Sequence, residues 1–333
     1  MNKTPESQGN HRVVIYGAGA IGGVVGSHLA LGGTEVILIG RSGHVNAINE
    51  HGLRLVTPTD THILHLSAVT SPDQIDFRPN DLVFLCVKSQ DTDEALRDLR
   101  TVVKDVPIFC FQNGVRNEEI AIKYFSVVYG VMIRDIGGVY ITDGEVMARR
   151  DPPGALVMGR YPVGTDNLLE SVAANLRKAE FHVLVTSDVI PYKWGKLIRN
   201  LHNTVDAITN AAEVEITRIT NAAQEEAQEL LARAGIRWIS DSELALQWPQ
   251  FSIPPRCRLS IEAKGSGWQS LARRRGTVEA DFFNGEIVRL ANRLGKQAPV
   301  NEMLLRTIQQ MAANHESPGK YSPTELLRML ELN

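Results

Sequence analysis

The sequence VVIYGAGAIGG at residues 13–23 decides the fold of the N-terminal part of the chain. Residues 13–16 are β-branched or aromatic, as in a short buried strand, and an apolar segment with helical spacing follows the glycines up to about residue 31. Residues 35–39 are predicted to form a second strand. A glycine motif between the strand and the helix of one βαβ unit predicts a Rossmann-type dinucleotide-binding domain, and therefore an α/β fold.

Each glycine of this motif has a separate physical role. Gly17 permits a tight turn, Gly19 lets the backbone approach a pyrophosphate, and Gly22 allows the helix to pack closely on the strand. The amides at the helix N-terminus bind the anion. The alternative is a glycine turn without a ligand. We predict that the cofactor-binding loop consists of Gly17, Ala18, Gly19, Ala20, Ile21 and Gly22.

The end of the second predicted strand bears on which cofactor is bound. Sites that prefer NAD usually place Asp or Glu there, but residues 36–43 contain no carboxylate. Arg41 offers instead a charge-assisted fork that suits a 2′-phosphate. The sequence therefore favours NADPH over NADH, with a solvated surface arginine as the alternative interpretation of Arg41.

Polar side chains follow two later predicted strands. Lys88 follows residues 81–87, and Asn113 follows residues 107–111. Ligands of open parallel sheets bind beyond the carboxyl ends of the strands, so both side chains are candidates for contacts with the cofactor or an anionic substrate. A solvated lysine and a plain Asn-Gly turn are the alternatives.

The length of 333 residues predicts two domains. We expect a polar tail at residues 1–11, the Rossmann domain at residues 12–187 and a mainly α-helical domain at residues 188–333. Short strands in residues 127–158 are expected to form hairpins that close the edge of the sheet, and residues 182–185 its last strand. Helices are predicted at 192–210, 221–234 and 278–294, and a loop at 249–255.

Composition excludes several classes of partner. The net charge of −3, from 35 basic and 38 acidic residues, provides no positive field for a nucleic acid or an anionic membrane. No apolar run approaches the ~20 residues that cross a bilayer. We expect a cytoplasmic protein with a small-molecule partner and no metal. A homodimer is compatible with the sequence, which shows no exposed apolar stripe to decide the oligomeric state.

The first helix of the second domain carries a polar stripe. Lys196, Asn200 and Asn203 fall at i, i+4 and i+7, so they project together from one side of a helix. Asparagine is a mediocre helix former, so this stripe points to a polar ligand, with a solvated helix face as the alternative. Glu279 and Asp281 begin the last main helix, where acids also stabilise the helix dipole.

Together these motifs resemble the ketopantoate reductase (2-dehydropantoate 2-reductase) family, and they occur in that family's order from residue 12 to about residue 295. They are GAGAIGG at 17–23, CVKS at 86–89, QNG at 112–114, WGKL at 194–197 with Asn200, and EAD at 279–281 followed by Asn284 and Gly285.

The resemblance implies that NADPH reduces a 2-oxo acid to a 2-hydroxy acid in a cleft between the two domains, first of all ketopantoate to pantoate in pantothenate biosynthesis. Lys196 matches the family's catalytic lysine and Glu279 its active-site glutamate. Asn113 and Asn200 match substrate-contacting amides, and Lys88 and Arg41 match positions beside the cofactor. Hydride transfer leaves charge on the substrate oxygen, which Lys196 would protonate while Glu279 orients the lysine.

The chain departs from the family pattern at two places. Thr204 and Val205 stand where many members have asparagine and proline, with Asn203 one place earlier, which is expected to alter the substrate pocket. Gly267 stands where a serine commonly binds the substrate carboxylate, a role that Ser266 or Ser270 could take. We count Asn203 and Ser266 among the predicted substrate-binding residues.

Two other functions remain open from the sequence. One is a reductase that acts on another 2-oxo acid or another carbonyl compound. The other is a non-catalytic NADP(H)-binding sensor. The pairing of Lys196 with Glu279 favours an enzyme, because a sensor needs no proton donor at the nicotinamide.

Overall fold

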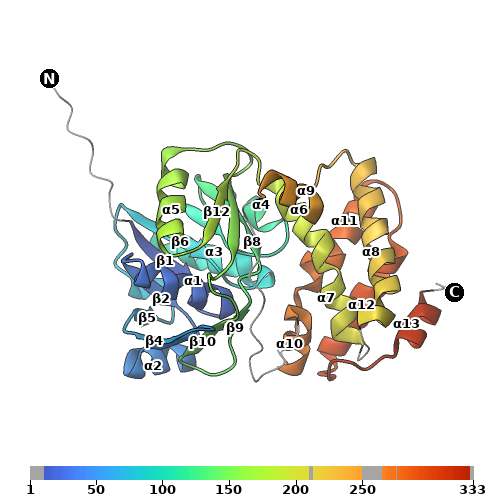
Figure 1. Ribbon diagram of the computed structural model, residues 1–333, viewed down its shortest axis with the longest axis horizontal. Helices are drawn as coiled ribbons and strands as arrows, with labels where there is room; N and C mark the ends of the chain where they lie inside the picture. Colours follow the sequence, from blue (N-terminus) through green and yellow to red (C-terminus); the bar gives the residue numbers. More distant parts are fainter. Residues whose placement is uncertain (1–10, 210–212, 250–264, 275, 331–333) are drawn as a thin grey trace. The chain divides into compact units, whose positions relative to one another are not determined.

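The computed structural model describes residues 11–209, 213–249, 265–274 and 276–330 (Figure 1). These residues form two compact units. The first holds residues 11–112, 116–190 and 245–249, and the second holds residues 113–115, 191–244 and the described residues from 265 onward. The predicted tail, except for His11, and residues 250–255 of the predicted loop lie outside the described residues.

The first unit is built on an eight-stranded sheet. Its strands, in spatial order, are β12 (His182–Val185), β11 (Ala155–Arg160), β8 (Val128–Arg134), β7 (Ile108–Cys110), β6 (Asp81–Leu85), β1 (Arg12–Tyr16), β2 (Val36–Ile39) and β5 (Ser67–Val69). The strands from β8 to β5 are parallel, and β11 and β12 run in the opposite direction. This is the predicted α/β architecture.

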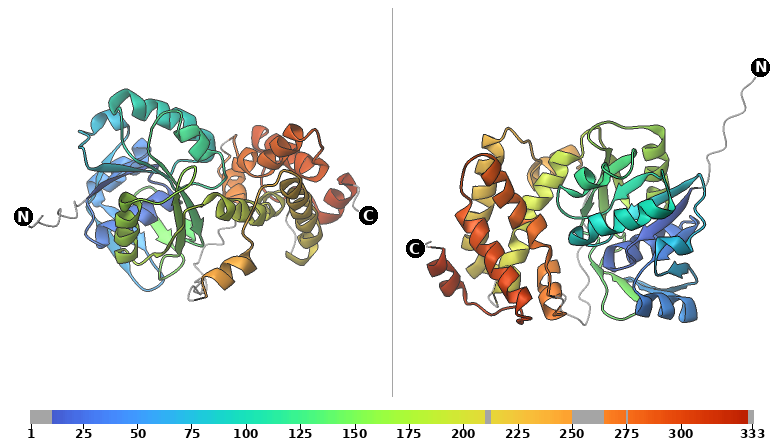
Figure 2. Two further views of the ribbon diagram at one scale, coloured as in Figure 1. Left: turned by 90° about the horizontal axis from the view of Figure 1, so that it is seen from above. Right: turned by 180° about the vertical axis from the view of Figure 1, so that it is seen from behind.

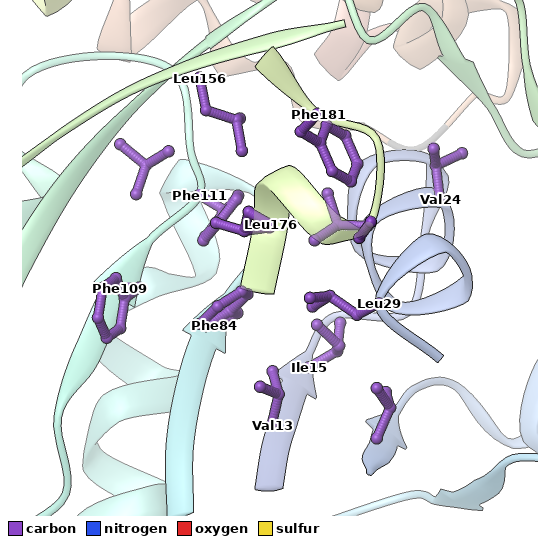
Figure 3. Close-up of a cluster of buried hydrophobic side chains, with 14 of the residues drawn as sticks. Val13, Ile15, Val24, Leu29, Phe84, Phe109, Phe111, Leu156, Leu176 and Phe181 are labelled. Atoms are coloured by element: carbon purple, nitrogen blue, oxygen red, sulfur yellow. The ribbon is translucent and has the colours of Figure 1, made fainter. Parts of the chain in front are cut away.

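Helices cover both faces of this sheet. They are α1 (Ala20–Leu31), α2 (Ser42–His51), α3 (Thr92–Val102), α4 (Asn117–Ala121) and α5 (Asn167–Lys178), with 3₁₀ turns η1 (Pro72–Gln74) and η2 (Ser89–Asp91). Alternate strand residues point to opposite faces. Ile15 and Phe84 pack with α1 and α5 on one face (Figure 3), and Val14 and Leu85 pack with α3 on the other face, which the rear view in Figure 2 presents.

The hairpin prediction for residues 127–158 was partly wrong. β11 pairs antiparallel with β8, one strand in from the edge strand β12 of the main sheet. In contrast, β9 (Gly138–Val139) and β10 (Glu145–Ala148) join β3 (Leu53–Val56) and β4 (Thr61–Leu64) in a separate four-stranded sheet. This small sheet packs on α1 through glycines. A Cβ atom at Gly138 would lie 2.5 Å from the Ala20 carbonyl oxygen, and one at Gly23 would lie 2.5 Å from Val146.

The second unit is helical. Its elements are α6 (Ile190–Asn200), α7 (His202–Ile208), α8 (Glu213–Arg233), α9 (Asp241–Gln247), α10 (Ser266–Ala272), η3 (Glu279–Phe282), α11 (Asn284–Arg293), α12 (Pro299–Ala313) and α13 (Pro323–Met329), where the first residue of α6 and the end of α9 are grouped with the first unit. A core of aliphatic side chains from α7, α8, α10 and α12 holds these helices together. In the described residues, no helix combines the length and the apolar character needed to cross a membrane.

Two helices predicted as continuous are interrupted. The predicted helix at 192–210 is divided at Leu201, whose amide donates to the Ile198 carbonyl three residues back. The predicted helix at 278–294 is divided at Phe283, where the backbone (φ −120°, ψ −91°) leaves the helical region. The apolar spacing continues through both interruptions, so periodicity alone could not reveal them.

A buried ion pair joins β1 to β6. Arg12 donates to both carboxylate oxygens of Asp81 at 2.8 and 2.6 Å, and to the Asp76 carbonyl at 2.7 Å. The hydrogen bonds to Asp81, with a Coulombic contribution, outweigh desolvation and raise the pKa of Arg12. Replacing Asp81 with asparagine removes the nearest carboxylate from this buried guanidinium and leaves the exposed Glu35, at 4.0 Å, as its ion-pair partner. We therefore expect the free energy of unfolding to fall by about 3–5 kcal/mol in urea titrations.

The matched control is Arg78→Gln, which breaks the exposed pair between Arg78 and Glu35. This change is expected to cost less than about 1 kcal/mol. Equal losses for the two variants would contradict the assignment of the Arg12–Asp81 pair as the stabilising one.

Candidate functional site

The glycine loop connects β1 directly to α1. Gly17 has a φ of +111°, and a Cβ atom there would lie 2.6 Å from the Val87 amide nitrogen. A Cβ atom at Gly22 would lie 2.7 Å from Cγ2 of Ile15 and would also collide with the Gly17 carbonyl. Only glycine fits either position without displacing the backbone.

Gly19 differs from these two glycines, because a Cβ atom at this position would meet no atom of the described residues within 4 Å. The loop is therefore open at Gly19. The amides of Gly17 and Ala18 donate to the Ile39 carbonyl at 3.0 and 2.9 Å, so a bound anion would draw on the amides that follow, at the first turn of α1. The open position and the helix N-terminus fit a dinucleotide pyrophosphate.

Arg41 follows β2 and is the N-cap residue of α2. Its side chain is exposed and forms no ion pair with the described residues. Sequence reasoning missed a carboxylate close by: a Cβ atom at Gly43 would collide with the Asp143 carboxylate, which comes from the segment between β9 and β10. Asp143 is 100 residues from Gly43 in sequence, so no local signal predicted this contact.

Lys88 and Asn113, both partly exposed, follow β6 and β7 as predicted. The two loops are joined by hydrogen bonds that the sequence did not indicate. Gln112 Nε2 donates to the Val87 carbonyl at 2.9 Å and to Thr92 Oγ1 at 2.7 Å, and the Thr92 hydroxyl donates to Asn117 at 2.9 Å. These bonds fix the backbone beside Lys88 to the residue before Asn113.

The polar stripe of the second unit is divided between two helices. Lys196 is partly exposed on α6, and Asn200, with 7% of its surface exposed, is the last residue of that helix. Asn203 lies beyond the interruption, on α7. The prediction of one continuous helical face was therefore wrong at Leu201, where the backbone hydrogen-bond pattern changes.

Asn203 lies against α10. A Cβ atom at Gly265 would lie 2.5 Å from Asn203 Oδ1, and one at Gly267 would lie 3.1 Å from the Asn203 carbonyl. The fold thus brings Asn203 to the helix that begins with Ser266, although the Ser266 side chain lies outside the described part of the structure. A side chain at residue 267 would therefore be in tight contact with the backbone of α7, which favours glycine there.

Glu279 is 6% exposed and begins the 3₁₀ turn η3, not a long helix. Lys196 and Glu279 belong to the same unit but to different elements. The Thr204 hydroxyl, on α7, donates to Asn284 Oδ1 at 2.5 Å, and Asn284 begins α11 directly after the segment that carries Glu279. Through this bond α7 holds the Glu279 segment.

Among the described residues, no group of three or more His, Cys, Asp or Glu side chains could hold a metal ion. The arrangement combines a doubly wound parallel sheet, a glycine loop open at Gly19, and a helical unit that supplies a lysine, amides and a buried glutamate. These features define the class: an α/β dinucleotide-binding protein with a separate helical unit.

Comparison with known proteins agrees with this class. Residues 13–162 match the model of the family "Ketopantoate reductase PanE/ApbA", and residues 188–312 match the model of its C-terminal domain. A 2-dehydropantoate 2-reductase of Pyrococcus abyssi is 31% identical over 88% of this chain and 95% of its own length. The enzyme of the same name from Pyrococcus horikoshii is 32% identical, with the same coverage.

Solved structures show the same fold. A PanE/ApbA family ketopantoate reductase from Ralstonia eutropha superposes with a TM-score of 0.77 at 28% identity, covering 91% of this chain and 99% of the other. A D-mandelate dehydrogenase superposes with a TM-score of 0.75 at 21% identity, with the same coverage, which supports the fold alone. The chain belongs to the ketopantoate reductase family, and it is an oxidoreductase.

Proposed function

We propose that this protein reduces a 2-oxo acid to the corresponding 2-hydroxy acid with NADPH, and that ketopantoate is its substrate, in the pathway to pantothenate. The observation that carries the proposal is the glycine loop, where two glycines are required by packing and the third, Gly19, leaves the backbone open to a ligand. The names of the relatives from both Pyrococcus species support the choice of substrate.

The residues that would hold NADPH lie in the first unit and in the Gln112–Asn113 turn. The loop from Gly17 to Gly22 would bind the pyrophosphate, Arg41 the 2′-phosphate, and Lys88 and Asn113 the part of the cofactor beyond the carboxyl ends of β6 and β7. When bound, NADPH supplies the hydride that reduces the carbonyl carbon. The protein residues then need only orient the reactants and supply the proton.

The second unit would supply that proton. A lysine side chain carries a proton at neutral pH, so Lys196 can donate to the oxygen on which negative charge develops. Glu279 would orient the Lys196 ammonium group and accept a hydrogen bond from the product hydroxyl. Asn113, Asn200, Asn203 and Ser266 would bind the polar groups of the substrate.

The preference for NADPH is tested at Arg41. We expect Arg41→Ala to weaken NADPH binding by about tenfold or more and to leave NADH binding within about twofold, because only NADPH carries the 2′-phosphate that a guanidinium can bind. The dissociation constants of both nucleotides are measured by fluorescence titration. Arg54→Ala, which removes an exposed arginine of the same unit, is the control. Equal weakening of both nucleotides would contradict this role for Arg41.

The function itself is tested by following the loss of NADPH absorbance with ketopantoate and with a panel of other 2-oxo acids, aromatic ones included. Oxidation that is fastest with ketopantoate is the expected result. Faster turnover of another acid would keep the reaction and change the substrate. Tight NADPH binding without turnover of any member of the panel would contradict the proposal and favour the sensor.

A further inference from the structure

The second unit contains a continuous chain of hydrogen bonds, buried except at its Glu226 end, that no part of the proposed reaction uses directly. The Thr204 hydroxyl donates to Asn284 Oδ1 at 2.5 Å, and Asn284 Nδ2 donates to Asn301 Oδ1 at 2.9 Å. Asn301 Nδ2 in turn donates to Glu226 Oε1 at 2.8 Å. Every donor in this series points in the same direction, toward the Glu226 carboxylate.

The carboxylate end of the chain is anchored to a helix terminus. Glu226, on α8, accepts hydrogen bonds from the backbone amides of Val300 and Asn301, both at 3.0 Å. These amides belong to the first turn of α12, which Pro299 begins. Glu226 therefore caps α12 from a neighbouring helix, and the charge at this end polarises the bonds that lead to it.

Three of the four members of this chain are enclosed, and Glu226 at its end is partly exposed. Asn284 and Asn301 have no exposed surface, and Thr204 is 2% exposed. Both polar ends of the Asn284 amide are used, the oxygen by Thr204 and the nitrogen by Asn301. A satisfied buried network of this kind allows one arrangement of the elements that contribute to it, because any displacement leaves a buried polar group without its partner.

The position of the Thr204–Asn284 bond relates it to the proposed reaction. Thr204 comes eight residues after Lys196, just beyond the interruption at Leu201 that separates α6 from α7. Asn284 comes five residues after Glu279, just beyond the interruption at Phe283 that separates η3 from α11. An interruption of the helical backbone thus lies between Thr204 and Lys196, and another lies between Asn284 and Glu279.

We propose that Thr204 and Asn284 are positioning residues, whose hydrogen bond fixes the segment carrying Lys196 and Asn203 relative to the turn carrying Glu279. This inference rests on the proposed function, because it assigns those residues a joint task in catalysis. The side chain of Thr204 is directed to a buried partner in its own unit.

The test compares Thr204→Val with Thr204→Ser. Valine keeps the size of the side chain and removes the hydroxyl, whereas serine keeps the hydroxyl. We expect Thr204→Val to lower kcat about 10- to 100-fold, because small displacements of catalytic groups have effects of that size, while the Kd for NADPH stays within about twofold. Serine should restore kcat to within about threefold of the wild-type value.

Thr307→Val is the matched control. Thr307 is also buried in the second unit, and among the described residues its hydroxyl donates within its own helix, to the Met303 carbonyl and sulfur. This variant should lose stability, measured as Tm, without a loss of kcat beyond about twofold. If Thr204→Val and Thr307→Val show the same loss of kcat for the same loss of Tm, the role of Thr204 is structural and the inference is overturned.

A double-mutant cycle with Glu279→Gln identifies the group through which Thr204 acts. If Thr204 positions Glu279, adding Thr204→Val to Glu279→Gln should lower kcat by less than about twofold further, because the positioned group is already lost. A full and independent further loss would overturn the inference while leaving the proposed function intact. Wild-type protein that turns over no 2-oxo acid would overturn both, which separates the two failures.

Discussion

Replacing Lys196 with alanine is expected to lower kcat for 2-oxo acid reduction by about 10³-fold, the middle of the range for loss of a positioned proton donor. That factor corresponds to about 4 kcal/mol of transition-state stabilisation. The Kd for NADPH should change by less than about twofold, because the lysine acts on charge that develops on the substrate oxygen. Steady-state absorbance measurements give kcat, and nucleotide fluorescence gives Kd.

The control for this prediction is Lys296→Ala. Lys296 is an exposed lysine of the same unit, beyond the end of α11, so its removal changes the net charge by the same amount without affecting the proposed site. Its kcat should stay within about twofold of the wild-type value. A Lys196→Ala variant with normal turnover, or one that has lost NADPH binding, would exclude this lysine as the proton donor.

Gly19→Ala is expected to abolish useful NADPH binding while leaving the fold unchanged. The space around a Cβ atom at residue 19 is empty of described atoms, and the backbone there (φ −77°) suits alanine, so Tm should stay within about 1 °C of the wild-type value. The added methyl group occupies the position that the pyrophosphate must approach. We expect the Kd for NADPH to rise at least about 100-fold, or about 2.7 kcal/mol.

Gly22→Ala provides the contrasting variant. Its Cβ atom would collide with the Gly17 carbonyl and with Ile15 inside the loop, so the protein itself is destabilised, by about 1–3 kcal/mol. Thermal unfolding and NADPH titration are measured on both variants. We expect Tm to fall for Gly22→Ala and not for Gly19→Ala, and both variants to lose NADPH binding. A Gly19→Ala variant that binds NADPH normally would show that the dinucleotide does not use this loop.

The glycine loop also shows how much of the site could be predicted from the sequence. The positions of Gly17, Gly19 and Gly22 depend on a turn, a helix start and one strand, all within about ten residues, and local sequence patterns predict such features well. The α/β fold, which was predicted from the same local patterns, is confirmed by the structure. The positions of Lys88 and Asn113 at strand ends were predicted because parallel strands share a common edge.

Other features depend on residues that are distant in the sequence. The contact between Gly43 and Asp143, the support of Asn113 by Gln112 and Thr92, and the bond between Thr204 and Asn284 each join different elements. No spacing rule connects such partners. The interruptions at Leu201 and Phe283 were missed because hydrophobic periodicity indicates which residues are buried. It does not indicate to which carbonyl each backbone amide donates its hydrogen bond.

The class of fold, the glycine loop between the first strand and the first helix, and the family of the chain could all be predicted from local motifs and their order. Only the three-dimensional structure shows that β9 and β10 form a second sheet and that Thr204 donates a hydrogen bond to Asn284. The physical reason is the range of the interactions. Backbone turns and helix starts are set by neighbouring residues, whereas buried hydrogen bonds and close packing are set by whichever elements the whole chain brings together.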